Sequence, residues 1–243
     1  AKYVAQLFSG INYDVKSLPG VYLGIVMGRH AGFLTASSSL LKKENGDGPN
    51  LIYIPESPFQ MNTFLSQVKT VFNKYGRCVI AISEGIQDKN KKLISQKITK
   101  KTEYDAHGNI QLSGTGSLGD YLSGEIKEKL KLPRVRADTL GYPQRCFLGS
   151  TSEIDQKEAL KIGRFAAKYS NKNNTSFSAG ILERKKFTNP YRTTFIANPL
   201  EKVAGKTKIM PKSFYNVKKS FVTNLFINYS LPLIGKKILK TKS

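Results

Sequence analysis

The feature that most restricts the fold of this chain is an apolar run that ends in Met27-Gly28-Arg29. Residues 21–26 read Val-Tyr-Leu-Gly-Ile-Val, which is typical of a strand buried on both faces of a parallel sheet. Open α/β sheets place ligands at the carboxyl ends of their strands, where Gly28 would let a ligand approach the backbone and Arg29 offers a planar fork of donors. Residues 33–41 keep helical spacing, so free N–H groups at the helix start would favour an anion. The run predicts a phosphate or sugar-phosphate site, and the alternative is a tight connection with a solvated arginine.

Apolar strands and amphipathic helices alternate along the rest of the chain, which predicts an α/β fold with a parallel sheet. The expected strands comprise residues 51–54, 78–82, a segment that begins at Arg134, 177–182 and 193–196. The expected helices comprise residues 2–8, 61–75 with Gly76 as cap, 118–130, 152–169 and a segment around 221–229, with turns over 10–13 and 18–20. At 243 residues the chain can form one large α/β domain or two smaller ones.

The cysteine content and the lengths of the apolar stretches indicate the compartment. Cys78 and Cys146 lie far apart in apolar contexts, and no secretory leader is visible, so reduced thiols of a cytoplasmic protein are expected. The longest apolar stretches have the length of strands, well short of the roughly 20 residues that a membrane-spanning helix needs. The sequence therefore predicts a cytoplasmic protein with no membrane partner.

The net charge is +22, from 39 Lys and Arg against 17 Asp and Glu. Between residues 201 and 243, ten lysines stand against Glu201 alone. Such a basic surface can bind nucleic acid non-specifically or attract small anionic substrates. Because the lysines are scattered as on solvated faces, and no nucleic-acid motif with interleaved aromatic residues accompanies them, no nucleic-acid partner is expected.

A glycine-rich segment, residues 114–119, matches the dinucleotide fingerprint, and Asp138 follows at about the expected distance. The residues before it are too polar for the buried strand that this motif requires. The favoured interpretation is a loop that leads into the helix over 118–130, and dinucleotide binding is the alternative. Residues 87–108 are polar and rich in lysine, and are expected to form a surface excursion with a hairpin around His107.

Two groups of polar residues are expected near strand ends. Glu84 follows the strand over 78–82, where its carboxylate could accept hydrogen bonds from ligand hydroxyls or cap the following turn. Residues 134–145 contain three arginines, at 134, 136 and 145, together with Tyr142. Because guanidinium groups pair bidentately with phosphate, this segment predicts a phosphate clamp.

In their order along the chain, several of these motifs resemble the sugar-phosphate half of the phosphofructokinases. They are Met27-Gly28-Arg29, Pro55-Glu56-Ser57-Pro58-Phe59, Ile82-Ser83-Glu84-Gly85, and Arg136 with Leu140-Gly141-Tyr142-Pro143-Gln144-Arg145. A later segment, Val203-Ala204-Gly205-Lys206-Thr207-Lys208-Ile209-Met210-Pro211, is similar to the pyrophosphate-dependent branch. The resemblance extends from about Tyr22 to Gly235 and implies a three-layer α/β/α Rossmann-like parallel sheet. Gly20 stands where the bacterial ATP-dependent pattern has an arginine, which argues against the allosteric behaviour of those enzymes.

The resemblance implies a phosphotransferase of glycolysis. It would phosphorylate fructose 6-phosphate to fructose 1,6-bisphosphate, reversibly, with pyrophosphate as donor and Mg2+ as cofactor. Met27, Gly28 and Arg29 are expected to contact the sugar phosphate or the transferring phosphoryl group, and Arg29 to stabilise that group. The alternatives are an ATP-dependent 6-phosphofructokinase and a non-catalytic sugar-phosphate-binding subunit.

The resemblance also assigns the remaining acceptor residues. Glu84 would hold the sugar hydroxyls, while Tyr142 and Arg145 would bind the 6-phosphate within one subunit. Arg136 would reach the same phosphate from a neighbouring subunit, which implies a homodimer or homotetramer.

The donor half of the family pattern has no counterpart in this sequence. The glycine-rich donor loop and the Thr-Ile-Asp segment, whose aspartate acts as the base, are expected upstream of Ala1. No metal ligand is expected in this chain, and magnesium would be held upstream or by the donor phosphates. Residues 1–145 are expected to form the sugar-phosphate-binding α/β domain, and residues 146–243 to pack back against the donor-binding domain.

Overall fold

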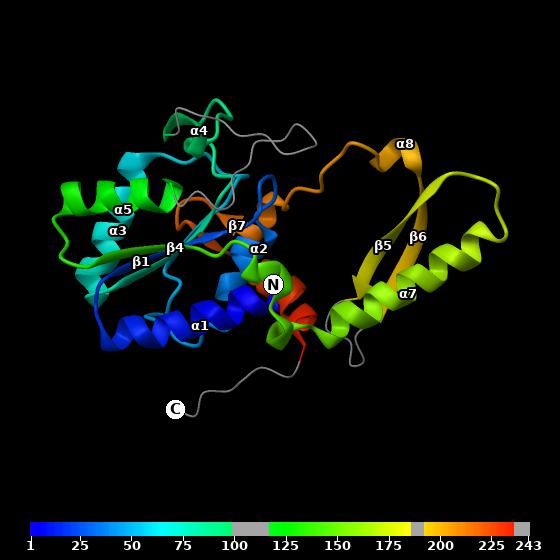
Figure 1. Cartoon of the computed structure of the whole chain (residues 1–243), viewed down its shortest axis with the longest axis horizontal. Coiled ribbons are helices and arrows are strands. Elements are labelled where there is room, and N and C mark those ends of the chain that lie inside the picture. Colours follow the sequence, from blue (N-terminus) through cyan, green and yellow to red (C-terminus); the bar gives the residue numbers. More distant parts are fainter. Residues whose placement is uncertain (99–116, 186–191, 236–243) are drawn as a thin grey trace.

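The computed structural model describes residues 1–98, 117–185 and 192–235, and shows a body built on a parallel sheet with an arm that stands off from it (Figure 1). The body begins with α1 (Lys2–Ser17), β1 (Val21–Val26), α2 (Phe33–Ala36), η1 (Ser37–Ser39), β2 (Leu51–Tyr53), α3 (Met61–Tyr75), β3 (Cys78–Ser83), α4 (Ile94–Ile98), α5 (Ser117–Leu130), β4 (Val135–Thr139), α6 (Pro143–Cys146) and η2 (Leu148–Ser150). The arm comprises α7 (Glu153–Ser170), β5 (Phe177–Lys185), β6 (Arg192–Pro199) and α8 (Leu200–Val203). The chain then continues through η3 (Lys212–Phe214), β7 (Tyr215–Asn216), β8 (Phe221–Val222), α9 (Asn224–Ser230) and η4 (Leu231–Ile234).

The sheet of the body has the strand order β2-β3-β1-β4, and every neighbouring pair is parallel. Val26 pairs with Ser83, so the carboxyl ends of β1 and β3 meet at one edge. Helices α3 and α5 lie on one face of the sheet and α1 lies on the other (Figure 1). This arrangement confirms the expected three-layer α/β/α fold.

Both faces of the sheet are packed with apolar side chains, which explains why its strands read as continuous apolar runs. On one face the strands pack against Phe64 of α3 and Leu122 of α5. On the other face they pack against Phe8 of α1 and Phe226 of α9. A Cβ atom on Gly24 of β1 would lie 2.6 Å from Cζ of Phe8, so this glycine makes room for α1.

Local signals end or begin two helices as expected. The residue after α3 is Gly76, whose φ of 67° is left-handed and whose N–H donates to the carbonyl of Phe72 at 2.7 Å. The side chain of Ser152 accepts a hydrogen bond from the N–H of Asp155 at 3.3 Å and caps α7. The expected positions of both helix ends are confirmed.

The turn that was expected over residues 10–13 is wrong, because α1 continues to Ser17. Asn12 and Val15 are buried, so the packed face of the helix extends beyond Gly10. Tertiary packing of an amphipathic face outweighs the cost of one exposed glycine in a helix.

Two other expected helices have different bounds. The helix expected over residues 33–41 is a single turn of α-helix followed by a 3-10 turn. There the hydroxyls of Ser37, Ser38 and Ser39 donate to carbonyls three residues back, at 2.6, 2.6 and 2.8 Å. Such local bonds compete with the α-helical pattern. The segment expected to be helical around 221–229 begins as strand β8 and becomes helical in α9.

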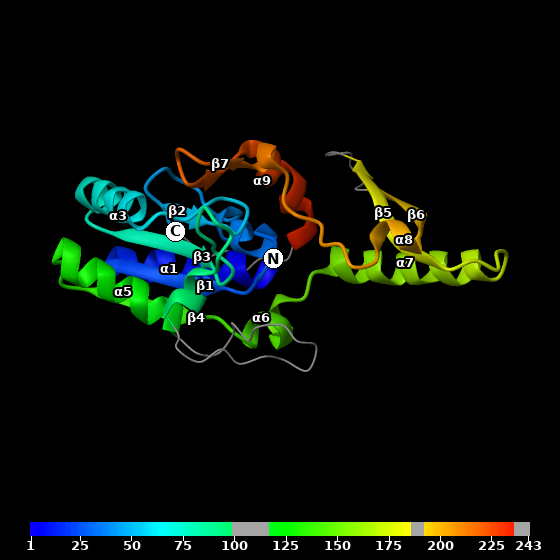
Figure 2. The same ribbon diagram turned by 90° about the horizontal axis from the view of Figure 1, so that it is seen from above.

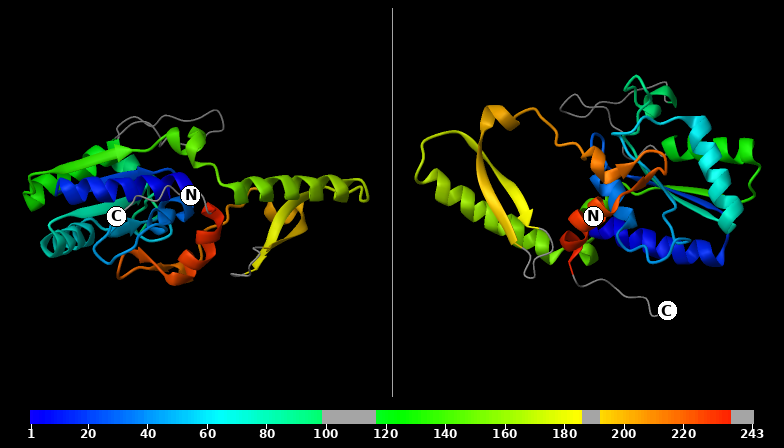
Figure 3. Two further views of the ribbon diagram at one scale, coloured as in Figure 1. Left: turned by 90° about the horizontal axis from the view of Figure 1, so that it is seen from below. Right: turned by 180° about the vertical axis from the view of Figure 1, so that it is seen from behind.

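The arm consists of α7 packed against the antiparallel β5–β6 hairpin (Figure 3). Aromatic contacts join the two layers: the ring centroids of Phe165 and Phe195 are 5.9 Å apart, and those of Tyr169 and Phe177 are 4.7 Å apart. Among the described segments, no helix combines the length and the apolar character that crossing a membrane requires.

After the arm, residues 210–234 return to the body (Figure 2). Met210, Val222 and Ile234 are buried in the core on the α1 face of the sheet. The hydroxyl of Tyr215 donates to the carbonyl of Ile52 in β2 at 2.6 Å. Part of the segment 146–243 therefore completes the sheet-bearing body, and packing of the arm against a donor-binding domain stays a prediction.

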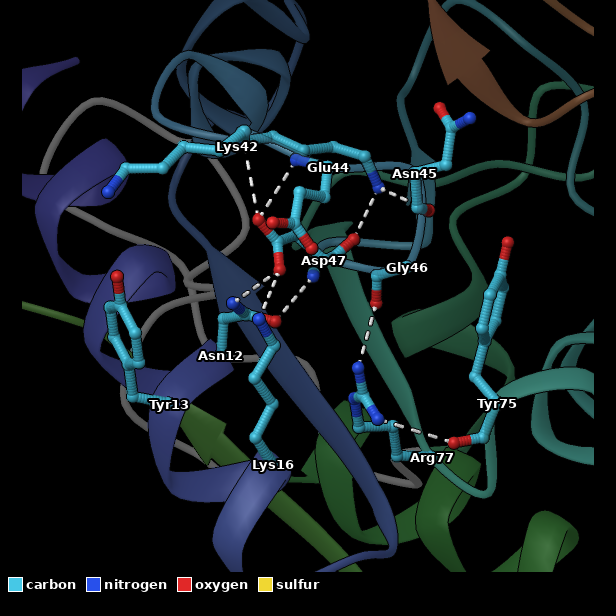
Figure 4. Close-up of polar contacts among 12 residues, drawn as sticks. Asn12, Tyr13, Lys16, Lys42, Glu44, Asn45, Gly46, Asp47, Tyr75 and Arg77 are labelled. Atoms are coloured by element: carbon cyan, nitrogen blue, oxygen red, sulfur yellow. Dashed lines mark hydrogen bonds and ion pairs between the residues drawn. The ribbon is translucent and has the colours of Figure 1, made fainter. Parts of the chain in front are cut away.

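The loop before β2 is tied to α1 through the buried carboxylate of Asp47 (Figure 4). This carboxylate accepts hydrogen bonds from the side chain of Asn12 at 3.1 Å and from the N–H groups of Lys43 and Glu44 at 3.2 and 3.1 Å. It also pairs with Nζ of Lys16 at 2.6 Å. Burial opposes its ionisation, but these bonds outweigh burial and hold the pKa of Asp47 well below its usual range.

Candidate functional site at the carboxyl edge of the sheet

The first group of expected site residues lies where β1 and β3 end side by side. The N–H of Glu84 donates to the carbonyl of Val26 at 2.9 Å, which extends the parallel pairing by one bond. Beyond this point the backbone N–H of Gly28 donates to Oε1 of Glu84 at 3.2 Å. The structure thus joins the predicted turn after β1 to the predicted carboxylate after β3.

Two glycines and one serine allow the two turns to approach each other closely. The hydroxyl of Ser83 donates to the carbonyl of Gly28 at 2.6 Å, and the N–H of Gly85 donates to the Ser83 hydroxyl oxygen at 3.2 Å. Gly28 has a φ of 148°, a conformation that side chains rarely adopt. A Cβ atom on Gly85 would lie 2.0 Å from the carbonyl oxygen of Arg29, so that position admits no side chain.

Glu84 is a buried carboxylate, with an exposed fraction of 8%. Burial raises its pKa, while the hydrogen bond from Gly28 and the charge of Arg29 act in the opposite direction. The hydrogen bond that Glu84 accepts from Gly28 belongs to neither of the two roles expected for this carboxylate, because the bond holds the turn that follows β1. A carboxylate offers about four acceptor sites, so this single bond leaves capacity for ligand hydroxyls.

The second group follows β4, which is the other neighbour of β1. Oε1 of Gln144 accepts a hydrogen bond from the N–H of Met27 at 2.9 Å, and this bond brings residues 142–145 to the same edge. The guanidinium carbon of Arg145 lies 5.5 Å from the centre of the Tyr142 ring. Tyr142 is 73% exposed, so the pair presents its donors to solvent beside the Met27 turn.

The other two arginines of the expected clamp lie elsewhere. Arg136 pairs in register with Tyr22, near the amino ends of β4 and β1, and its side chain is exposed. The carbonyl of Arg134 accepts a hydrogen bond from the N–H of Val21, at the same amino edge. Within one chain the structure does not bring the three arginines together, whereas Arg145 does lie with Tyr142. A clamp completed by Arg136 of a neighbouring subunit stays a prediction.

The start of α2 is already occupied by a carboxylate, which corrects the expectation of free N–H groups there. The N–H of Gly32 donates to both side-chain oxygens of Glu56, at 3.0 and 3.1 Å. The N–H of Met210 donates to Oε1 of Glu56 at 2.8 Å. Glu56 thus fixes the segment that resembles the pyrophosphate-dependent branch next to the turn that carries Arg29.

Two residues of the family motifs have contacts at this edge that the sequence did not predict. Glu56 and Gln144 each accept hydrogen bonds from backbone groups of other segments. A polar residue inside an ordered family motif is the signal that could have drawn attention to them. The backbone partners themselves depend on the folded sheet.

Gly20 lies against the chain that leads into β4. A Cβ atom on Gly20 would lie 2.8 Å from the carbonyl oxygen of Arg134 and 2.9 Å from its Cγ atom. An arginine at this position could not be accommodated without a shift of Arg134. The departure from the bacterial ATP-dependent pattern therefore has a steric counterpart in the fold.

Within residues 1–98, 117–185 and 192–235, no three His, Cys, Asp or Glu side chains gather as they would around a metal ion. His107 and residues 114–116 of the glycine-rich segment lie outside the described residues. The helix expected over residues 118–130 is present as α5, and the choice between the loop and dinucleotide interpretations of the segment before it stays a prediction.

Comparisons of the sequence and of the fold with known proteins lead to one family. The sequence model of the phosphofructokinase family matches residues 1–169. The chain is 49% identical over 236 residues to a pyrophosphate–fructose 6-phosphate 1-phosphotransferase of Rhodospirillum rubrum, covering 97% of this chain and 57% of the relative. A protein of the same name from Xanthomonas campestris is 32% identical over 238 residues, covering 96% and 55%. The crystal structure of a pyrophosphate-dependent phosphofructokinase from Marinobacter aquaeolei matches with a TM-score of 0.79 and 25% identity, covering all of this chain and 56% of that one.

The chain spans a little over half the length of these relatives. The family match extends from the first helix into α7 and includes every residue of the carboxyl edge from Met27 to Arg145. Apart from Arg136, four of the motifs that suggested the family lie at or after the carboxyl ends of neighbouring strands of one sheet. The chain therefore belongs to the phosphofructokinase family.

Proposed function

We propose that the whole protein transfers a phosphoryl group from pyrophosphate to the 1-hydroxyl of fructose 6-phosphate, reversibly. The observation that carries this proposal is the 49% identity to a protein named for that reaction, over nearly the full length of this chain. The carboxyl edge supports it, because Glu84, Tyr142 and Arg145 supply the acceptors and donors that a sugar phosphate needs. The two free cysteines favour a reducing compartment, and we place the protein in the cytoplasm.

In this proposal the described residues bind and orient the acceptor. Arg145 and the Tyr142 hydroxyl bind the 6-phosphate, and Glu84 accepts hydrogen bonds from sugar hydroxyls. Arg29 lies on the turn that Glu84 holds, where its positive charge would stabilise the transferring phosphoryl group. The new bond joins the sugar oxygen to phosphorus, the bridging bond of pyrophosphate breaks and phosphate leaves, while the aspartate base of the family pattern takes the proton of the 1-hydroxyl. Magnesium would neutralise donor charge, and we assign it no ligand in the described residues.

We further propose that Arg136 acts on the 6-phosphate of a neighbouring subunit in a homodimer or homotetramer. Two observations support this role. Its side chain is exposed, and its register with Tyr22 places it near the opposite edge of the sheet from Arg145. Within one chain it is therefore poorly placed to share a phosphate with Arg145.

An assay with each donor tests the proposed reaction. The complete polypeptide is expected to form fructose 1,6-bisphosphate from fructose 6-phosphate with pyrophosphate and magnesium. The reverse reaction should produce pyrophosphate from fructose 1,6-bisphosphate and phosphate. Activity with ATP and none with pyrophosphate would assign the alternative donor. Binding of fructose 6-phosphate without turnover on either donor would instead support a non-catalytic subunit.

Arg145→Ala and Arg136→Ala are expected to weaken fructose 6-phosphate binding by about tenfold to a hundredfold each, because a hydrogen bond to a charged partner contributes roughly 1.5–3 kcal/mol. The Michaelis constant for the sugar phosphate should rise with little change in kcat, because the 6-phosphate is held alike in the ground and transition states. Tyr142→Phe removes a neutral donor and should cost less, roughly 0.5–1.5 kcal/mol.

Lys69→Ala is the control, since Lys69 is an exposed basic residue on α3 of the body. It should leave both kinetic constants unchanged. If Arg145→Ala also leaves the Michaelis constant for fructose 6-phosphate unchanged, the proposed phosphate site is misplaced and Arg145 is a solvated surface residue.

A further inference from the structure

Gln144 lies between the two proposed phosphate-binding residues and has its own contact across the sheet edge. It belongs to the short helix α6, with Tyr142 before it and Arg145 after it. Its Oε1 accepts the hydrogen bond from the N–H of Met27 at 2.9 Å. Tyr142 and Arg145 turn to solvent, whereas the Nε2 atom of Gln144 is buried.

The position of this bond follows from the end of the parallel ladder. The N–H of Leu140 donates to the carbonyl of Ile25, and this is the last backbone bond that links β4 to β1. In a ladder that continued, the next N–H of β1, that of Met27, would donate to a carbonyl of β4. Since β4 ends at Thr139, the side-chain oxygen of Gln144 supplies that acceptor instead.

The amide of Gln144 also has an energetically unfavourable feature, which packing alone does not explain. Among the described residues, Nε2 of Gln144 has no hydrogen-bond partner. A buried amide donor without a partner is unfavourable, and an apolar residue of similar shape would avoid it. An apolar residue would, however, leave the N–H of Met27 without its acceptor, so the useful part of the amide is its oxygen.

We propose that Gln144 is a positioning residue. It fixes the Met27 turn relative to the Tyr142–Arg145 phosphate site, so that the two ends of the sugar phosphate are held in the correct position relative to each other. This inference rests on the proposed function. The chain of contacts runs from Arg145 through Gln144 to Met27, and from Gly28 to Glu84. Gln144 touches the backbone of the turn and acts through it.

Loss of a positioning residue should change the kinetic constants differently from loss of a phosphate-binding residue. In Gln144→Met the residues that contact the 6-phosphate remain, so the Michaelis constant for fructose 6-phosphate should change less than about threefold. The reacting end of the sugar is no longer aligned with Arg29, so kcat should fall by about tenfold or more, because small errors of alignment have large effects on rate. Arg145→Ala should give the reverse split.

Hydrogen exchange of the complete polypeptide tests the bond without relying on turnover. In Gln144→Met, amides of residues 26–30 should exchange faster, while those of α3 keep their protection. Gln144→Glu keeps an acceptor oxygen and should restore protection of residues 26–30. Gln60→Met is the matched control, because Gln60 is exposed before α3 and its side chain makes no hydrogen bond to that helix; it should change neither exchange nor rate.

The possible results separate failure of this inference from failure of the proposed function. Unchanged exchange over residues 26–30 in Gln144→Met would overturn the inference, as would faster exchange with an unchanged kcat. Faster exchange over the whole body would show a general loss of stability and would also count against it. If the unmodified protein turns over neither donor, the proposed function fails. The positioning role of Gln144 is then tested by the binding of fructose 6-phosphate. In that case fructose 6-phosphate should protect residues 26–30 in the unmodified protein but not in Gln144→Met, and equal protection in both would overturn it.

Discussion

Gly85→Ala is expected to lower kcat/KM by at least about a hundredfold, because misplacing a reacting group by about 1 Å has an effect of that size. A Cβ atom at this position would lie 2.0 Å from the carbonyl oxygen of Arg29, 2.6 Å from its carbonyl carbon and 2.8 Å from its Cα. All three are backbone atoms, so no side-chain rotation relieves the overlap. Either the Arg29 turn or the segment after β3 must move, and both belong to the proposed site.

The displacement should also be visible in the stability of the protein. Moving the Arg29 turn breaks the bonds that join Gly28 to Ser83 and Glu84. Overpacking of this kind typically costs about 1–3 kcal/mol, so the midpoint of urea unfolding should fall. Steady-state kinetics with fructose 6-phosphate and pyrophosphate, together with urea unfolding, measure the two effects.

Gly124→Ala provides the control for this substitution. Gly124 lies within α5, and an added Cβ atom there meets nothing within 4 Å. Alanine in an open helical position should keep the activity and stabilise the protein by roughly 0.5–1 kcal/mol. If Gly85→Ala behaves like Gly124→Ala, the two turns are not packed as described, and the tight contact between Arg29 and Gly85 is wrong.

The sequence predicts the layers of this fold well, because strands that are buried on both faces of the sheet consist almost entirely of apolar residues. Residues 21–26 and 78–82 read as apolar runs, and both lie in strands of the sheet. Local caps predict the end of α3 and the start of α7. The length of α1 was not predictable from local signals, because burial of Asn12 and Val15 against the rest of the body carries the helix past Gly10.

The candidate site was only partly visible in the sequence for a related reason. Glu84 and Arg145 follow strands that are neighbours of β1, so both lie at the carboxyl edge, where sheets of this kind bind ligands. Glu56 and Gln144 accept hydrogen bonds from backbone N–H groups of distant segments. Almost every residue type has a backbone N–H group, so the sequence does not show which one Glu56 or Gln144 binds. Only the folded chain identifies these partners.

Asp47→Ala is expected to destabilise the protein by about 2–4 kcal/mol, because it leaves the buried amide of Asn12 and two partly buried backbone N–H groups without their acceptor. The carboxylate serves the side chain of Asn12, two backbone N–H groups and the ammonium group of Lys16 (Figure 4). Lys16 is partly exposed and can be solvated, so the estimate lies below the full cost of breaking a buried ion pair. The bonds that Asn12 and Lys42 make to the backbone around Asp47 should weaken with it.

Asp14→Ala is the matched control, since Asp14 is an exposed aspartate on the same helix as Asn12 and Lys16. Its effect on the free energy of unfolding should stay within about 0.5 kcal/mol. Urea unfolding of the three proteins at neutral pH measures both differences. If Asp47→Ala is no less stable than Asp14→Ala, the loop before β2 does not depend on this carboxylate.

The difference between the unmodified protein and Asp47→Ala should also depend on pH. The pKa of Asp47 lies below its usual range in the folded protein, so between the folded and unfolded values the unfolded state binds more protons. The contribution of Asp47 is therefore complete above the ordinary aspartate pKa of about 4 and is lost as the pH falls towards the folded value. The unfolding midpoints of the two proteins should converge below about pH 4, since only the unmodified protein has this carboxylate to protonate. A gap that stays constant down to pH 3 would show that shape, and not the charge of Asp47, holds the loop to α1.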